Sequence, residues 1–228
     1  AYEIVSRDWS SDVCSSDLGY RAGIANTASY NTFIGHESGQ ANTSGTSNTA
    51  LGRVSFYTNT TGSYNTAIGH NAMVYSTTGS YNTSLGEGSL QNNTTASSNT
   101  AVGYQAAYSN TTGSPITAMG FHALYYNTTG ADNVAIGYNT IAGNSGGLTG
   151  GANTAVGDYA LISLSSGNYN TAHGYQSLYS NTTASNNTAV GYQSLYYNTT
   201  GAQNTAVGQG ALSSNTTGNY NTAMGEIG

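Results

Sequence analysis

A large apolar residue recurs at a fixed place in the motif Asn-Thr-x-φ-Gly, where φ is that apolar residue. Copies of the motif begin at Asn31, Asn48, Asn65, Asn82, Asn99, Asn153, Asn170, Asn187, Asn204 and Asn221, with variant copies at Ile116 and Asn133. Ten of the eleven gaps between these starts are seventeen residues and one is twenty. Such strict spacing predicts a solenoid, in which each repeat forms one coil and neighbouring coils bury a continuous core.

We count the Asn of each motif as position 1. Position 5 is Gly in every copy, which indicates either a positive φ or a second backbone passing close by. Position 4 is apolar in eleven of the twelve copies, and position 9 is a second, looser apolar site. We predict that positions 4 and 5 form the structural core of the repeat: Ile34, Leu51, Ile68, Leu85, Val102, Met119, Ile136, Val156, Val190, Val207 and Met224, with Gly35, Gly52, Gly69, Gly86, Gly103, Gly120, Gly137, Gly157, Gly174, Gly191, Gly208 and Gly225.

The remaining positions predict short strands and turns rather than helices. Positions 12 to 15 read Asn-Thr-Thr-Gly or a close variant, which is turn chemistry. We expect two strands per coil, one at Thr-Ala-φ-Gly-Tyr and one near positions 8 to 11, since Gly, Asn and Thr are poor helix formers. Stacked coils would align identical residues, so that Asn amides form ladders and Tyr rings stack. The predicted fold is an all-β parallel solenoid of about twelve coils.

Composition narrows the possible functions. Only 5% of the residues are charged, the chain has no Lys, and its formal net charge is −6. Nucleic acid is therefore not an expected partner, because no basic patch is available. No apolar run approaches the roughly 18 residues that span a bilayer. Two large apolar side chains per coil bury too little surface to order seventeen residues, so we expect further burial between chains packed around a common axis.

The first eighteen residues do not belong to the repeat. Residues 1–18 contain the only Trp and the only Cys of the chain. Residues 8–18 resemble a translated reading frame of a widely used sequencing adapter, and residues 1–4 resemble its upstream part. We therefore expect 1–18 to be an adapter-derived artefact, and 19–228 to be a repetitive fragment cut at both ends. Neither disulfide nor thiol chemistry is then expected.

The core Asn133-Val134-Ala135-Ile136-Gly137 resembles the head repeat of trimeric autotransporter adhesins, the YadA-like heads. Related Asn-Thr-Ala-Val-Gly-Tyr-Gln repeats, as at 187–193, occur in tail-fibre-like proteins. The resemblance covers 19–228 and implies a left-handed parallel β-roll, three identical chains wound into one rod, and a place outside the cell, on a cell or virion surface. It also implies that position 4 lines the interior. The seventeen-residue period is longer than the usual head repeat, which predicts a larger external loop.

Few residues suggest chemistry. His173 replaces the apolar residue at position 4, and on a three-fold axis it could form an ion site; a tolerated polar layer with water is the alternative. His36, His70 and His122 are expected at the surface. Glu37, Glu87, Asp132, Asp158 and Glu226 are scattered, so no acid/base pair is predicted. No catalytic residue, cofactor or other metal site is therefore expected.

Two further features could concern the surface. Asn-x-Thr triplets such as Asn198-Thr199-Thr200 match glycosylation acceptors, although turn preference explains them better. The segment 144–152 contains three extra residues, and a loop displayed there would be a reasonable contact site.

Three functional hypotheses follow. The first is a non-enzymatic extracellular structural or adhesive fibre segment, a homotrimeric adhesin head contacting an unknown surface receptor or glycan. Its alternative is a phage or bacterial tail-fibre shaft. The second is an ice-binding solenoid, because position 2 is Thr in eleven of twelve copies and stacked Thr would lie about 4.8 Å apart. The third, a carbohydrate-processing enzyme, is disfavoured because such enzymes need clustered carboxylates.

Overall fold

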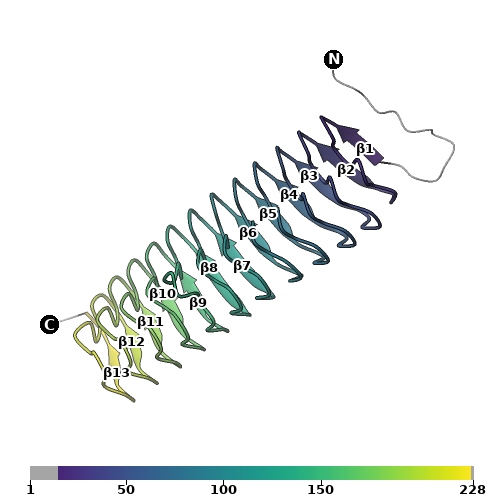
Figure 1. Ribbon diagram of the computed structural model, residues 1–228. Helices are drawn as coiled ribbons and strands as arrows, with labels where there is room; N and C mark the ends of the chain where they lie inside the picture. The colour runs from purple at the N-terminus through teal and green to yellow at the C-terminus, as the bar shows by residue number, and fades with distance from the viewer. Residues whose placement is uncertain (1–14, 227–228) are drawn as a thin grey trace.

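The chain forms a rod in which one β-sheet runs the whole length (Figure 1). The structure is a computed structural model that describes residues 15–226. None of these residues lies in a helix. Thirteen strands are hydrogen-bonded side by side in the order of the sequence. They are β1 (Ser15–Leu18), β2 (Asn31–Ile34), β3 (Thr49–Leu51), β4 (Thr66–Ile68), β5 (Thr83–Leu85), β6 (Thr100–Val102), β7 (Ile116–Met119), β8 (Asn133–Ile136), β9 (Thr154–Val156), β10 (Thr171–His173), β11 (Thr188–Val190), β12 (Thr205–Val207) and β13 (Thr222–Met224).

All strand pairs are parallel, and their register confirms the predicted solenoid of about twelve coils. Thr188 in β11 pairs with Thr205 in β12, seventeen residues on, and this offset holds along most of the sheet. The step from β8 to β9 is twenty residues, as expected from the longer repeat. Identical positions therefore lie above one another along the rod. The left-handed winding implied by the resemblance stays a prediction.

The N-terminal end of the sheet includes part of the segment attributed to an adapter. Residues 15–18 form β1 and pair with β2. Backbone pairing does not depend on side-chain identity, so the adapter origin stays a prediction, and residues 1–14 lie outside the described residues. Gly19 has a φ of 139°, similar to the position-5 glycines, which places Gly19 and Tyr20 at positions 5 and 6 of a coil.

Each coil contains one strand, so the prediction of a second strand near positions 8 to 11 is wrong. Residues at positions 7 and 9 have positive φ; in one coil these are Val54 at 58° and Phe56 at 53°. Alternating left-handed residues bend the chain and prevent an extended strand. The coils are nevertheless bonded to one another here, since the Phe56 amide donates to the Ala72 carbonyl at 2.9 Å.

The interior of the coil is narrow, and positions 3 and 9 together hold at most one large side chain. Position 3 points inward and is usually Ala, while position 9 is usually a large apolar residue; Ala189 and Leu195 are both fully buried. In the coil that begins at Asn31 the sizes are exchanged, because Phe33 is at position 3 and Gly39 at position 9. A Cβ atom on Gly39 would lie 2.5 Å from the Phe33 ring. A large side chain thus enters from position 3 or from position 9, but not from both, and in the coil that begins at Asn99 both positions are Ala.

Two ladders of buried Asn complete the interior, as predicted for position 1. The Asn65 side chain at position 1 donates to Asn48 Oδ1 at 3.1 Å and to the Gly79 carbonyl at 2.9 Å. At position 12, Asn59 donates to Asn42 Oδ1 at 2.6 Å. Because Asn65 and Asn59 each bond the preceding coil, and Asn65 also bonds a turn carbonyl, such amides fix the stacking. The ladders are not unbroken: Ile116 interrupts the first, Ser76 and Leu164 interrupt the second, and Asn127 Oδ1 has no hydrogen-bond partner.

Candidate functional site

Position 4 lies on the outside of the coil, which corrects the prediction that it lines the interior. In strands such as β5 and β10, the middle residue is buried and its two neighbours are exposed. Positions 2 and 4 therefore share one surface, which we call the outer sheet face. Leu51 is 44% exposed and Leu85 45%, although both are large and apolar. The sequence correctly predicted that positions 3 and 4 point to opposite sides of the sheet. It did not predict that position 4 points outward, which it does because position 9 already fills the interior.

The outer sheet face carries a row of apolar side chains at position 4 beside a row of Thr at position 2. Val134 replaces Thr in β8, and His173 replaces the apolar residue in β10. From β2 to β13 neither row contains Asp, Glu, Lys or Arg. This face can therefore be buried against another surface without removing a formal charge from water.

The position-5 glycines hold successive coils close together. They have both a positive φ and a second backbone passing close by. Their φ values lie between 126° and 139°, a region that other residues rarely adopt. A Cβ atom on Gly103 would lie 2.5 Å from the Gly120 carbonyl oxygen of the next coil. The Gly103 amide also donates to the Leu85 carbonyl at 2.8 Å. These residues are structural and keep the sheet continuous.

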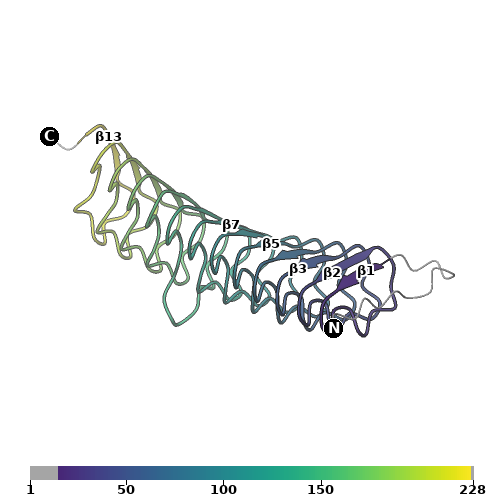
Figure 2. The ribbon, with the colours of Figure 1, turned by 90° about the horizontal axis from the view of Figure 1, so that it is seen from above.

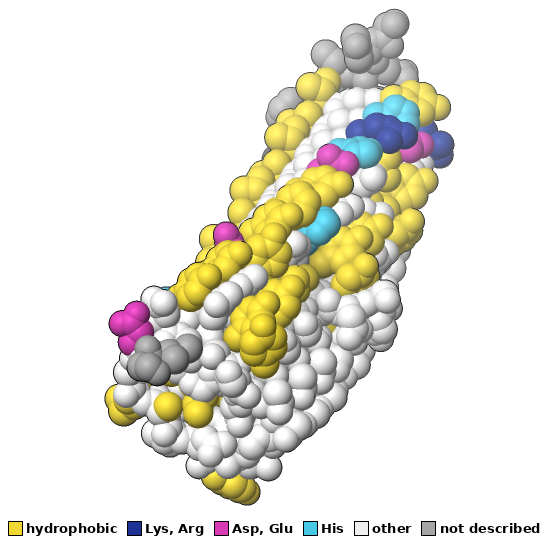
Figure 3. All heavy atoms as spheres, turned by 90° about the vertical axis from the view of Figure 1, so that its left-hand side faces the viewer, with side chains coloured by type: hydrophobic (Ala, Val, Ile, Leu, Met, Phe, Trp, Pro, Cys, Tyr) yellow, Lys and Arg dark blue, Asp and Glu magenta, His cyan; other side chains and the backbone are white. Residues whose placement is uncertain are grey.

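Aromatic rings form a second surface at position 6, next to the outer sheet face. Phe121 stacks on Tyr104 with ring centroids 5.2 Å apart and on Tyr138 at 5.1 Å. Tyr175 and Tyr192 stack at 5.6 Å. Figure 3 shows hydrophobic side chains gathered into lines that run along the rod. Because stacked rings cover each other's faces, they present mainly edges and hydroxyl groups to solvent.

Tyr also stacks at position 10, where two pairs lie at 4.9 and 5.2 Å. Burial is the largest cause that raises the pKa of Tyr125 above its usual value, and neighbouring Tyr groups add to it. The same order of causes raises the pKa of Tyr196. These phenols therefore favour the neutral form, as expected of rings that cover apolar surface.

Charged side chains gather toward the N-terminal end of the position-6 line. Arg53 Nη1 lies 3.1 Å from His70 Nε2, and His70 Nδ1 lies 3.6 Å from Glu87 Oε1. Arg53 can only donate, so His70 Nε2 accepts where this hydrogen bond is made. Glu37 contacts Arg21 at 3.7 Å. Figure 3 shows this short run of cyan, dark blue and magenta side chains at one end of the rod.

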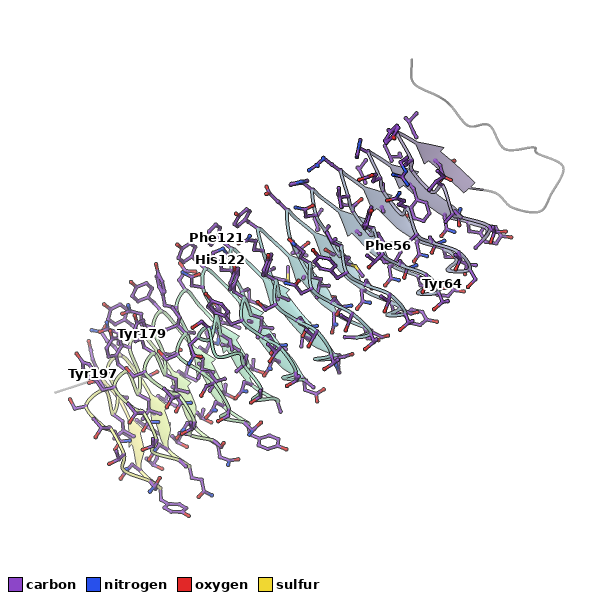
Figure 4. All side chains as sticks on the ribbon, in the orientation of Figure 1. Phe56, Tyr64, Phe121, His122, Tyr179 and Tyr197 are labelled. Atoms are coloured by element: carbon purple, nitrogen blue, oxygen red, sulfur yellow. The ribbon has the colours of Figure 1, made fainter. Side chains whose placement is uncertain are left out.

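The acidic residues and the other histidines do not form a reactive group. Glu37 and Glu87 lie three coils apart, and Asp158 accepts the Tyr138 amide at 2.8 Å. His122 Nε2 lies 2.9 Å from Gln105 Oε1, and burial lowers the pKa of His122 below its usual value. Figure 4 shows His122 beside Phe121 at one edge of the rod. Within residues 15–226, no group of three metal-ligating side chains is present.

A displayed loop is present in the segment 144–152, where three extra residues had suggested one. The extra residues leave the coil after Gly143 and return at Leu148, which is fully buried and bridges to Asn127. Residues 144–146 are exposed, and Figure 2 shows one loop standing out from the row of coils. Within the loop, the Gly146 amide donates to Asn144 Oδ1 and the Gly147 amide donates to the Asn144 carbonyl. The loop is therefore a displayed segment rather than a built pocket.

The Asn-x-Thr triplets are structural. Asn198 is fully buried, and its amide nitrogen donates to the Gly201 carbonyl at 2.8 Å and to Asn181 Oδ1 at 3.3 Å. A glycan cannot be attached to a buried nitrogen that is already bonded. Turn preference, rather than glycosylation, therefore explains the triplet Asn198-Thr199-Thr200.

No protein-family model matches the chain, no curated protein is similar to it, and no solved structure resembles it. Among the described residues, no helix is long and apolar enough to cross a membrane. The outer sheet face, the aromatic lines and the displayed loop are therefore the candidate functional surfaces.

Proposed function

We propose that residues 19–226 form a segment of a non-enzymatic extracellular fibre in which three copies of the chain pack through their outer sheet faces. The observation that supports this most strongly is the uncharged outer sheet face with its apolar row. Sheets made only of parallel strands are nearly always covered on both sides. Here the coil covers the inner side alone, so the outer side lacks a cover.

A second copy of the same chain fits this face better than an unrelated partner. The apolar residues recur at every seventeenth position over most of the sheet, so only a surface with the same spacing can interlock along the whole rod. Fully burying one such side chain contributes about 1.5–3 kcal/mol. Eleven half-exposed or exposed residues, repeated in each copy, give a large driving force for assembly. The number three comes from the resemblance to trimeric adhesin heads.

Charge introduced on the outer sheet face tests this assembly. The double variant Leu51→Glu/Leu85→Glu places carboxylates at the proposed interface and should give single chains in sedimentation analysis. Its control is Thr61→Glu/Thr95→Glu, which changes exposed residues in the same two coils but away from that face. The wild-type chain and the control should sediment at three times the 23.3 kDa of one chain. A single-chain mass for the folded wild-type protein would refute the proposal.

The adhesive part of the proposal assigns contact with other surfaces to features that the assembly leaves exposed. These are the aromatic lines and the loop at 144–147. A tail-fibre shaft is the alternative within the same class, since a shaft needs assembly but no contact site. Binding of the wild-type chain and of a variant lacking residues 144–146 to immobilised glycans or cells separates the two. Equal absence of binding favours the shaft.

An ice-binding role is the second candidate, and the position-2 row supports it. Thr side chains of successive strands point outward from the same sheet, in register. Parallel strands place such residues about 4.8 Å apart, which is a regular array of hydroxyl and methyl groups. The two roles compete for one face, because assembly would bury the Thr row. Thermal hysteresis measured on the single-chain form decides this; its absence excludes ice binding.

A further inference from the structure

We propose that Tyr64 and Tyr81 form an oxidative cross-linking site, at which a dityrosine bond joins two adjacent coils. Both residues are at position 17, and their rings stack with centroids 5.0 Å apart and planes within 1° of parallel. Tyr64 is 55% exposed and Tyr81 62%, so an oxidant can reach both. Figure 4 places Tyr64 at the edge of the rod opposite Phe121 and His122, away from the other aromatic lines.

The chain has few other means of covalent reinforcement. It contains no Lys, which excludes amide cross-links through a lysine side chain, and its single Cys cannot form a disulfide within the chain. Tyr, in contrast, occurs twenty times. A bond between positions 64 and 81 would join two coils that are otherwise held by hydrogen bonds and packing, such as the 3.0 Å bond from the Tyr81 amide to the Ser63 carbonyl.

The chemistry needs a peroxide-driven one-electron oxidant, such as a haem peroxidase with hydrogen peroxide. Each phenol loses one electron and one proton and becomes a tyrosyl radical. A carbon–carbon bond then forms between the two ring carbons ortho to oxygen, and the ring hydrogens shift to restore both phenols. The two tyrosines lose two protons and two electrons in total. One hydrogen peroxide takes these up and yields two waters.

Proximity gives this pair its advantage over exposed tyrosines that have no stacked ring neighbour, such as Tyr169. Two radicals in adjacent coils meet at an effective concentration near the millimolar range of closely tethered groups, whereas radicals on different molecules meet at the protein concentration. The side chains are on the surface, so they can rotate from the stacked arrangement to bonding distance. Stacking thus selects the partner, and exposure permits the reaction.

The repeat supplies a natural control. Tyr169 is also at position 17 and is 67% exposed, but position 17 of the adjacent coils holds Ala152 and Asn186. Tyr169 therefore matches Tyr64 in backbone position and accessibility while lacking a ring neighbour. The substitution Asn186→Tyr would supply that neighbour, because residues 169 and 186 are seventeen apart.

The experiment treats the full chain at about micromolar concentration with a haem peroxidase and limiting hydrogen peroxide, then maps dityrosine by proteolysis and mass spectrometry. We expect the 64–81 link within single chains to exceed any link at Tyr169 by at least about tenfold, given the difference in effective concentration. Tyr81→Phe should abolish the link at Tyr64 while leaving the fold intact by circular dichroism. Asn186→Tyr should create a new link to Tyr169.

Three results would overturn the proposal. The first is a 64–81 yield no higher than the yield at Tyr169. The second is dityrosine at Tyr64 that survives Tyr81→Phe in single chains. The third is a folded Asn186→Tyr variant in which Tyr169 stays unlinked. Assembly through the outer sheet face is tested separately by sedimentation, so failure of one proposal does not imply failure of the other.

Discussion

The exchange of sizes between Phe33 and Gly39 gives a sharp test of how the interior is filled. Phe33 is fully buried and occupies the space that a position-9 side chain fills in other coils. Phe33→Ala should destabilise the protein by about 3–5 kcal/mol, because it leaves a cavity. Gly39→Leu should cost about 1–3 kcal/mol, because its Cβ would lie 2.5 Å from an enclosed ring.

The double variant Phe33→Ala/Gly39→Leu should recover most of this loss. It reproduces the pair at Ala189 and Leu195, and Leu195 has a φ of 51°, close to the 58° of Gly39. The double variant should therefore lie within about 1.5 kcal/mol of the wild-type protein, as volume-conserving exchanges do. Because the single costs sum to about 4–8 kcal/mol, the coupling between the two sites is then at least about 2.5 kcal/mol in favour of the pair.

Denaturant unfolding measures the free energies, and hydrogen exchange over residues 31–47 measures local opening. The second measurement is needed because a stacked array need not unfold in one step. Additive effects, with the double variant less stable than either single variant, would refute the idea that one large side chain fills each layer.

Three further predictions concern the backbone and pH. Gly103→Ala should lower the free energy of unfolding by about 3 kcal/mol or more and split the unfolding transition, because a strained φ costs about 1–3 kcal/mol and hydrogen bonds to the adjacent coil are lost. The control is Gly225→Ala, which has a similar φ but nothing within 4 Å of the added Cβ. This control should show the cost of the strained φ alone. Val54→Asn should raise the melting temperature, because it relieves about 1 kcal/mol of strain in a β-branched residue with a left-handed conformation. Asn71 has this conformation at the same position of the next coil. An unchanged or lower melting temperature would contradict the prediction. Burial lowers the pKa of His122, so the folded state binds fewer protons than the unfolded state. The free energy of unfolding should therefore fall as the pH drops below 6.5, the pKa of the unfolded histidine. In melting curves recorded at several pH values, His122→Gln should show a weaker pH dependence.

The period, the glycine at position 5 and the turn at positions 12–15 were predictable, because each depends on local backbone requirements that every repeat restates. The Asn ladders were predictable too, since buried amides need partners in the next coil. The direction of position 4 was not predictable. Alternation shows only that Ala189 and Val190 point to opposite sides, and hydrophobicity favours the larger residue inside. The deciding factor is volume, because Leu195 enters the same layer from the opposite wall.

The single strand per coil was missed for a different reason. Residues such as Val54 and Phe56 have strand propensity, yet they adopt left-handed conformations because the coil must turn there to close. Tertiary closure overrides local preference in this case. The surface features were only partly visible in sequence. The equal spacing predicted that Tyr rings would stack. The structure was needed to place position 17 on the surface, where Tyr64 has a ring neighbour and Tyr169 does not.

The central functional claim is that the outer sheet face of one copy contacts another copy. A photo-cross-linking amino acid, p-benzoyl-phenylalanine, incorporated in place of Leu85 tests this contact directly, with Thr95 in the same coil as the matched control. Irradiation of the folded protein should join chains when the probe is at position 85, giving species of up to three chains on a denaturing gel, and should leave single chains when it is at position 95. Single chains from both positions, or equal cross-linking from both, would contradict the account.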